Sequence, residues 1–381
     1  MTEFNTFKNY VSPETAKSII TTSVKYLLEN PNLADKIPAI LLRGNPGVGK
    51  STIVRDVAKN LNIGFKDIRL AQMDRVDLCG VPSVNDNKTQ WNIPSVWPDM
   101  DDKQGGIILF DEITSAPADV QVAAYSMILD RRIPNTNYAL PKTWFIVAAG
   151  NTTTDRAVVR SMSSALANRF AHLDVSTSVE DFISYGIENH FNPAILGFVQ
   201  FRPDKLLDMN TENSNLEAGW PSPRSWERVS TTLSIFENAN EDITRNVVYS
   251  LIGTNTGLEF MEFLKISKNN ASVLEMLDGK IPVSIPTKID EKYAFYTAIS
   301  YLVFDVKTKA EIDKRLSVVF KILDKSENDY ATMLLKMITG GNQKFSKKDI
   351  LLMLIKNKEY KNYAKKHSEM LNNAKVVNLD I

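Results

Sequence analysis

Residues 44–51 read Gly44-Asn45-Pro46-Gly47-Val48-Gly49-Lys50-Ser51, a complete G-x-x-x-x-G-K-S phosphate-binding loop. The apolar run Ile40-Leu41-Leu42 precedes the loop, and a segment that favours a helix, Thr52-Ile53-Val54, follows it. The glycines allow successive backbone N–H groups to face a β-phosphate, where the positive end of the helix dipole also points. Lys50 is expected to reach the β/γ-phosphates, and the Ser51 hydroxyl is expected to ligate Mg²⁺. The sequence therefore predicts a nucleotide site rather than an ordinary glycine turn.

The composition of the chain disfavours several classes of protein. Its 381 residues include 45 basic and 45 acidic side chains, so no net charge indicates an obligate nucleic-acid or membrane surface. The single cysteine, Cys79, excludes an intrachain disulfide and fits a reducing compartment. Residues 1–6 lack the basic-then-apolar pattern of a signal peptide, and no window approaches the roughly eighteen apolar residues of a membrane span. We expect a soluble, cytoplasmic protein without membrane insertion.

Strand and helix patterns alternate through the first half of the chain. Ser12-Pro13 is a typical helix start, because serine caps free N–H groups and proline fits the first turn. Unbroken apolar runs such as residues 107–110 are typical of a parallel sheet covered on both faces. Beyond Val175 helical periods dominate. The predicted strands are 38–42, 65–70, 107–110, 144–148 and 171–175. The predicted domains are an α/β core at 1–176, a helical lid at 177–272 and a helical C-terminal extension at 273–381.

A pair of carboxylates ends one of the predicted buried strands. Ile107-Ile108-Leu109-Phe110 runs directly into Asp111-Glu112, the Walker B layout. At a strand end beside the phosphate loop, Asp111 is expected to ligate the magnesium ion held by Ser51, and Glu112 to polarise the attacking water. Charged residues also end strands at ordinary protein surfaces. Their position downstream of a phosphate loop favours the catalytic interpretation.

Two further polar side chains complete the pattern. The run at residues 144–149 ends at Gly150-Asn151, whose carboxamide is expected to hold the lytic water or the γ-phosphate, a role called sensor 1. Alone, Gly-Asn after a strand is simply a turn. Arg169 lies between a short helix and the last strand, where it suits a finger that reaches a neighbour's γ-phosphate in trans. A solvated cation at a helix C-terminus is the alternative, and Arg156 and Arg160 are weaker candidates for the same role.

In this order the motifs resemble those of the AAA+ ATPases and, within them, of the MoxR-like family. The resemblance rests on the phosphate loop, on Asp111-Glu112-Ile113-Thr114-Ser115-Ala116-Pro117 running into Val120-Gln121, on Gly150-Asn151 and on Asn168-Arg169-Phe170. A fifth segment, Pro221-Ser222-Pro223-Arg224-Ser225-Trp226-Glu227, is similar to the sensor 2 segment of MoxR-like proteins that accompany von Willebrand factor A domain proteins. Arg224 is expected in the first turn of a helix, where a cation is unfavourable unless an anion is near.

The resemblance implies an AAA+ P-loop NTPase core, a parallel sheet sandwiched by helices, with an all-α lid and a helical extension. It implies an ATPase that uses ATP and Mg²⁺ and assembles as a ring, with six subunits expected. The ring would remodel or activate a partner protein, and a von Willebrand factor A domain protein is the first candidate. The implied catalytic residues are Glu112, Asn151, Arg169 and Arg224. The implied nucleotide ligands are Gly44, Asn45, Pro46, Gly47, Val48, Gly49, Lys50, Ser51, Thr52 and Asp111, and the implied magnesium ligands are Ser51 and Asp111.

Two other functions stay open at this stage. A nucleic-acid motor such as a helicase has a similar core, and a predicted hairpin at residues 131–138 carries two arginines, with Tyr138 and Lys142 beside them. One small basic cluster on a neutral protein is more typical of a solvated face, so nucleic acid is not the expected partner. The second alternative is a scaffold that binds nucleotide without hydrolysing it. Such a scaffold needs neither Glu112 nor Arg169.

Two segments lie outside the core chemistry. Residues 77–98 are similar to the helix-2 insert that AAA+ rings of this clade turn toward a partner or the pore. Trp91 and Trp97 within it are expected to pack rather than to grip a substrate, because apolar residues on a small hairpin need burial first. Residues 344–366 combine an apolar helical stripe with lysines. They predict an amphipathic helix, either a solvated surface helix, a membrane-surface helix or a docking site.

Overall fold

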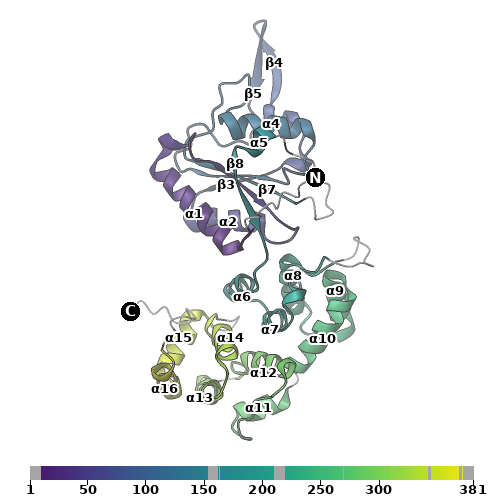
Figure 1. The fold of residues 1–381 in the computed structure, drawn as a ribbon, viewed down its shortest axis with the longest axis vertical. Coiled ribbons are helices and arrows are strands. Elements are labelled where there is room, and N and C mark those ends of the chain that lie inside the picture. The colour runs from purple at the N-terminus through teal and green to yellow at the C-terminus, as the bar shows by residue number, and fades with distance from the viewer. Residues whose placement is uncertain are drawn as a thin grey trace, which may run out of the picture. The chain divides into compact units, whose positions relative to one another are not determined.

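The computed structural model describes residues 10–152, 162, 164–209, 219–268, 270–306, 308–341, 345–368 and 371. The chain divides into two compact units, Met1–Ser178 and Val179–Ile381. Figure 1 shows the strands gathered in the first unit, whereas the second unit is built from helices.

The first unit is built around a six-stranded sheet whose strands follow the spatial order β1-β8-β2-β7-β6-β3. Every neighbouring pair is parallel. The interior strands β6 and β7 are buried along nearly their whole length, as expected when helices cover both faces of a parallel sheet. The strands are β1 (Tyr10–Val11), β2 (Ala39–Arg43), β3 (Gly64–Arg69), β6 (Gly106–Asp111), β7 (Trp144–Gly150) and β8 (Phe170–Val175). Five of them were predicted, and the sixth, β1, is too short to leave a pattern in the sequence.

Helices lie on both sides of this sheet, with α1 and α2 on one side and α4 and α5 on the other (Figure 1). The predicted start of α1 is confirmed, because the Ser12 side chain accepts a hydrogen bond from the Thr15 N–H and Pro13 occupies the first turn. The helices of this unit are α1 (Pro13–Glu29), α2 (Lys50–Leu61), α3 (Arg75–Cys79), α4 (Ala118–Asp130) and α5 (Ser164–Ala167). Short 3₁₀ turns cover Pro31–Leu33 and Leu70–Gln72. The predicted fold class, a parallel sheet sandwiched by helices, is confirmed.

A two-stranded antiparallel hairpin, β4 (Val81–Asn85) and β5 (Lys88–Asn92), is inserted between α3 and β6. Its turn residues Asp86 and Asn87 both have positive φ angles, 48° and 58°, which suits a tight hairpin turn. Figure 1 shows the hairpin projecting beyond the layers of sheet and helices. Most of its side chains are exposed.

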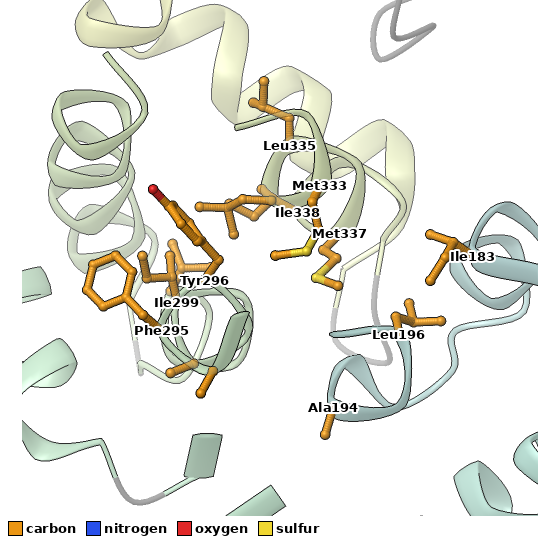
Figure 2. Packing of buried hydrophobic residues seen from close by; sticks show 14 of the residues in the cluster. Ile183, Ala194, Leu196, Phe295, Tyr296, Ile299, Met333, Leu335, Met337 and Ile338 are labelled. Carbon is orange, nitrogen blue, oxygen red and sulfur yellow. The ribbon is translucent and has the colours of Figure 1, made fainter. Parts of the chain in front are cut away.

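The second unit consists of helices around one hydrophobic core that extends from Phe182 to Leu371. Figure 2 shows part of this core, where Tyr296 of one helix lies beside Ile338 of another. No helix in the described part of the chain combines the length and apolarity needed to cross a membrane. The helices are α6 (Val179–Glu188), α7 (Pro193–Phe201), α8 (Pro223–Ile235), α9 (Glu241–Ile252), α10 (Thr254–Lys268), α11 (Ala271–Leu277), α12 (Ile289–Leu302), α13 (Lys309–Leu323), α14 (Asn328–Thr339), α15 (Lys347–Lys356) and α16 (Lys358–Lys366), and a 3₁₀ turn covers Pro203–Lys205. This core contains residues of both the predicted lid and the predicted extension, whose separate roles stay predictions.

The predicted amphipathic helix at 344–366 is corrected by the structure, because α15 and α16 are separate helices that meet at Asn357. Asn357 is 1% exposed and donates hydrogen bonds to the Asp313 carbonyl and carboxylate and to the Ser317 hydroxyl of α13. Its own side-chain oxygen caps α16 by accepting the Tyr360 N–H. The apolar residues Ile350 and Leu354 lie in the core. The stripe is therefore largely used for packing rather than presented to a membrane.

Candidate nucleotide-binding site

The sheet topology brings three predicted motifs to one edge. Strand β7 lies between β2 and β6 and pairs with both in parallel. The phosphate loop follows the carboxyl end of β2, Asp111 ends β6, and Asn151 follows β7. Because the strands are parallel, their carboxyl ends meet at the same edge of the sheet, which is the usual place for ligands in α/β folds.

The conformation of the phosphate loop explains its glycines. Gly47 and Gly49 have φ angles of 82° and 94°, in the region that favours glycine over any residue with a side chain. A Cβ atom on Gly44 would lie 2.4 Å from the Val175 carbonyl oxygen. Gly49 is the N-cap of α2, and its carbonyl accepts the first helical hydrogen bond, from the Ile53 N–H, at 2.9 Å. The loop thus leads straight into a helix N-terminus, as an anion site requires.

Lys50 is buried at the base of this loop, with 8% of its surface exposed. Its ammonium donates to the carbonyl oxygens of Gly44 at 2.6 Å and Asn45 at 3.0 Å, and to the Asn151 side-chain oxygen at 3.1 Å. A buried ammonium needs such acceptors, because its desolvation is otherwise costly. These contacts hold the charge against the loop that would cradle the phosphates. They also join the loop directly to the predicted sensor 1 residue.

Ser51 and Asp111 form the second contact between the motifs. The Ser51 hydroxyl donates to one Asp111 carboxylate oxygen at 2.6 Å, across 60 positions of sequence. A hydroxyl and a carboxylate are the hard oxygen donors that Mg²⁺ prefers, and they lie within one hydrogen bond of each other here. The residues present therefore fit a magnesium ion shared with a nucleotide. The other Asp111 oxygen accepts the Glu112 N–H at 2.9 Å and so orients the start of the next turn.

Glu112 occupies an unusual backbone conformation, with a φ angle of 58°. A non-glycine residue in the left-handed region carries a cost of order 1–3 kcal/mol, and such residues cluster at functional sites. The turn is held on both sides, since Ile113 donates its N–H to the Ala149 carbonyl at 3.0 Å and Ser115 donates to the Glu112 carbonyl at 2.9 Å. This strained turn sets the direction in which the Glu112 side chain leaves the sheet.

The sequence interpretation assigned no role to Thr114 or Gln121, and both brace this edge. The Thr114 hydroxyl accepts the Asn151 N–H at 3.0 Å and donates to the Asn151 carbonyl at 3.3 Å. The Gln121 side chain, 4% exposed, donates to the Ile113 carbonyl at 3.0 Å and to the Ala116 carbonyl at 3.3 Å. Both residues belong to the segment that carries the family resemblance. That is the signal that pointed to them, although it did not reveal their partners.

Arg169 lies at the opposite edge of the same sheet. Its neighbour Phe170 pairs with Ala39 at the start of β2, whereas the phosphate loop follows Arg43 at the end of that strand. A strand of 5 residues at about 3.3 Å per residue separates the two edges by about 13 Å. Arg169 is exposed and lines, with Lys36 and other residues, a cavity of about 90 Å³. The structure therefore does not bring Arg169 to the phosphate loop of its own chain.

Arg224 belongs to the second unit, and its position relative to the phosphate loop stays a prediction. It is exposed in the first turn of α8, where the Ser222 side chain caps the helix by accepting the Ser225 N–H. Trp226 in the same turn is 0% exposed and donates from its ring nitrogen to the Lys205 carbonyl at 2.8 Å. The weaker arginine-finger candidates, Arg156 and Arg160, lie outside the described residues.

The predicted hairpin at 131–138 differs from the expectation of a basic surface. Residues 132 and 139 form an isolated antiparallel bridge, so the segment does fold back on itself. However, Tyr138 is 2% exposed and donates its hydroxyl to the Pro98 carbonyl at 2.7 Å, and burial raises the pKa of this phenol. Arg131 is also buried and donates to the Trp144 carbonyl at 2.6 Å. Tyr138 and Arg131 therefore serve the core, whereas Arg132 and Lys142 of the same predicted cluster are exposed.

The expected packing role of Trp97 is confirmed. Its ring is 4% exposed, donates to the Leu78 carbonyl at 2.9 Å and meets the Phe110 ring at a centroid distance of 6.1 Å. Trp91 on β5 is half-buried. The root of the insert is thus fixed to the core, whereas its tip carries Val84, which is 75% exposed.

Comparison with known proteins agrees with this geometry. The sequence model of the AAA domain (dynein-related subfamily) matches residues 39–170. This segment is an AAA domain. It contains the phosphate loop, Asp111, Asn151 and Arg169, and with the parallel sheet and the helical C-terminal region it gives the chain the AAA+ P-loop NTPase fold.

Individual relatives are distant. The chain is 27% identical over 126 residues to the RuvB subunit of the Holliday junction branch migration complex from Phytoplasma mali, which covers 33% of this chain and 32% of that protein. The match thus spans only about a third of the relative. A Cytophaga hutchinsonii protein provisionally named an ATPase is 17% identical, with a TM-score of 0.31, over 90% of this chain and 94% of that one. A RuvB mutant from Thermotoga maritima is 17% identical, with a TM-score of 0.34, over 70% of this chain and 77% of that one. Scores at this level have no bearing on function.

Proposed function

We propose that this protein is a magnesium-dependent ATPase of the MoxR-like AAA+ type, which works as a ring and uses hydrolysis to remodel or activate a partner protein. The observation that carries the proposal is the meeting of Lys50, Ser51, Asp111 and Asn151 at one edge of the sheet through direct hydrogen bonds. The strained turn at Glu112 adjoins them. This set contains each kind of group that phosphoryl transfer to water requires.

The roles of the residues follow from their chemistry. Bound Mg·ATP would supply the phosphoanhydride bond and the Lewis acid. The loop N–H groups from Gly44 to Thr52 and the Lys50 ammonium would bind phosphate oxygens, while Ser51 and Asp111 would hold the metal. Glu112 would accept a proton from the attacking water, and the neutral Asn151 carboxamide would orient that water or the γ-phosphate. Arg224 would contact phosphate as sensor 2.

A ring is supported by the position of Arg169. The opposite edge of the sheet is out of reach of the chain's own loop, so a finger there acts only on a neighbouring copy. A contact of one edge with the other edge of the next copy is heterologous, and such contacts form rings when they close. Six subunits, and a von Willebrand factor A domain protein as the partner, are the expectations from the MoxR-like motifs. The projecting hairpin β4–β5 is the surface we assign to that partner.

A nucleic-acid motor is the second candidate, because the matched relative is the RuvB subunit of a branch migration complex. Against it stand the neutral composition and the burial of Tyr138 and Arg131. Single-stranded or junction DNA that stimulates the ATPase, with a steep loss of stimulation as salt rises, would favour this candidate over the protein remodeller.

The experiment that tests the proposal is steady-state phosphate release with Mg·ATP, compared in wild type, Glu112→Gln and Lys50→Ala. We expect turnover in the wild type, none in either variant, and retained ATP binding in Glu112→Gln alone. Lys50→Ala removes the point charge that faces the phosphates, whereas Glu112→Gln removes only the base. A wild type that binds nucleotide without turnover would instead indicate a scaffold. Equal turnover in Glu112→Gln and wild type would remove Glu112 from the mechanism.

A further inference from the structure

We propose that Thr114 is a positioning residue for hydrolysis, which fixes Asn151 relative to the turn that carries Glu112. The inference rests on the proposed ATPase function and names a residue that the family motifs leave without a role. Its basis is a pair of hydrogen bonds between one side chain and the backbone of another site residue, across 37 positions of sequence.

The contact is specific to a hydroxyl. Thr114 is 7% exposed, and its oxygen both accepts the Asn151 N–H at 3.0 Å and donates to the Asn151 carbonyl at 3.3 Å. A threonine hydroxyl offers one donor and two acceptor positions, so both bonds form at once. Asn151 comes directly after the last residue of β7, where the ladder no longer holds the chain. The hydroxyl therefore replaces the missing strand partner and fixes both ends of the Asn151 backbone.

Thr114 packs closely against the main chain at Gly150. A Cβ atom on Gly150 would lie 2.6 Å from the Thr114 methyl group and 2.8 Å from its hydroxyl. The glycine at the end of β7 thus lets the threonine approach the main chain. The sequence alone predicts a sensor 1 carboxamide at Asn151, with a simple turn at Gly150-Asn151 as the alternative. The structure gives the glycine a second purpose, which is to admit Thr114.

The same turn positions the predicted base. Glu112 precedes Thr114 by two residues, and Ile113 between them donates to the Ala149 carbonyl at 3.0 Å. The Asn151 side-chain oxygen in turn accepts from Lys50 at 3.1 Å. Thr114 therefore joins the turn of the base to the residue that contacts the phosphate-loop lysine. A shift of the Glu112 turn is therefore transmitted to Asn151, and the reverse, through the two hydrogen bonds of the Thr114 hydroxyl.

The prediction is a loss of kcat with little change in nucleotide affinity. Thr114→Val keeps the shape of the side chain and removes both hydrogen bonds, so Asn151 loses its backbone support while the phosphate loop stays intact. We expect kcat to fall at least about tenfold, with the Kd for ATP changed by less than about threefold. Thr114→Ser keeps the hydroxyl and is expected to retain most of the activity. A control is Thr297→Val, since Thr297 is a buried threonine whose hydroxyl has no hydrogen-bond partner among the described residues.

A double-mutant cycle separates positioning from general damage. If Thr114 acts through Asn151, then Thr114→Val adds nothing to the loss already caused by Asn151→Ala, and the two effects are strongly non-additive. Gly150→Ala approaches the same contact from the other side and is expected to lower kcat in a way that Asn151→Ala also masks. It serves as the second probe if Thr114→Val folds poorly in a thermal unfolding scan.

The outcomes distinguish this inference from the function on which it rests. Turnover in the wild type with an unchanged kcat in Thr114→Val, or equal losses with and without Asn151, would overturn the role of Thr114 alone. Activity lost equally in Thr114→Ser and Thr114→Val would also overturn it, because the hydroxyl would then not be the active feature. A wild type without magnesium-dependent turnover would overturn the proposed ATPase and this inference with it.

Discussion

Different interactions hold together the core of the second unit and the edge of the sheet in the first unit where Lys50, Ser51, Asp111 and Asn151 meet. At the edge, polar side chains meet through hydrogen bonds of 2.6 to 3.1 Å, and the backbone at Glu112 is strained. The core of the second unit is apolar, and its aromatic rings pack at centroid distances such as 5.2 Å between Trp226 and Phe260. Chemistry at the edge depends on orientation, whereas stability of the helical unit depends on area buried. Substitutions at the edge should therefore lower turnover, whereas substitutions in the helical core should lower the free energy of unfolding.

The largest effect is expected from Arg169→Ala, which should lower kcat by about 10³-fold or more while ATP affinity and thermal stability stay nearly unchanged. The reason is that an exposed side chain at the far edge packs against little but would stabilise charge at a neighbour's γ-phosphate. The measurement is phosphate release together with nucleotide binding and a thermal scan.

Mixed assemblies sharpen that result. On the proposed mechanism, subunits carrying Arg169→Ala lack the finger and subunits carrying Glu112→Gln lack the base, so each variant alone should be inactive. Mixing the two should recover turnover at interfaces that pair an intact Glu112 with an intact Arg169. Mixtures that co-assemble without recovery would assign Arg169 a role within its own chain or in the fold.

In the helical unit the corresponding test is Trp226→Ala. The indole is 0% exposed and contacts the rings of Phe198 and Phe260, so its loss should cost about 3–5 kcal/mol of the free energy of unfolding. Trp226→Phe is the matched control, because it keeps a ring and removes mainly the hydrogen bond to Lys205, worth about 1–2 kcal/mol. Urea unfolding of both variants checks the values, and equal costs would mean that the ring itself contributes little.

The sequence predicts the residues of the candidate site but not the contact that braces them. Lys50, Ser51, Asp111 and Asn151 were identified because each motif has a fixed local spacing, and their convergence follows once strand order is known. The contact of Thr114 with Asn151 was not predictable, since it needs the pairing of β6 with β7 and a glycine that admits the side chain. The catalytic roles of these residues stay predictions, which the experiments above test.

Two segments differ from their sequence predictions because contacts with distant parts of the chain decide their structure. Tyr138 was weighed as a surface residue because it follows two arginines, yet the amphipathic phenol is buried with its hydroxyl satisfied by a backbone carbonyl. The apolar stripe and the lysines at 344–366 predict one amphipathic helix, but the structure divides it at Asn357. Its side chain makes a tertiary contact with α13 that no local pattern reveals.

Asn357→Ala tests the contacts at the junction between α15 and α16. It is expected to cost about 1–3 kcal/mol of the free energy of unfolding. The substitution removes the cap of α16 together with the hydrogen bonds that Asn357 donates to Asp313 and Ser317. An exposed cap is the matched control, and Asn240 provides one, since it accepts the Asp242 N–H at the start of α9. Asn240→Ala should cost about 0.5–1 kcal/mol. Equal losses would show that the tertiary contacts of Asn357 add nothing to a simple cap.

The smallest effect is expected at the tip of the inserted hairpin. Val84 is 75% exposed, so Val84→Ser should change the free energy of unfolding by less than about 0.5 kcal/mol and leave basal ATPase as in the wild type. Trp97→Ala at the root of the same insert is the contrast, because the buried indole contacts Phe110 on the Walker B strand and its loss should destabilise the core by about 3–5 kcal/mol. A basal turnover lowered by Val84→Ser at unchanged stability would mean that the tip contacts another copy in the ring. The hairpin would then belong to the assembly of the motor, and its assignment to an external partner would be wrong.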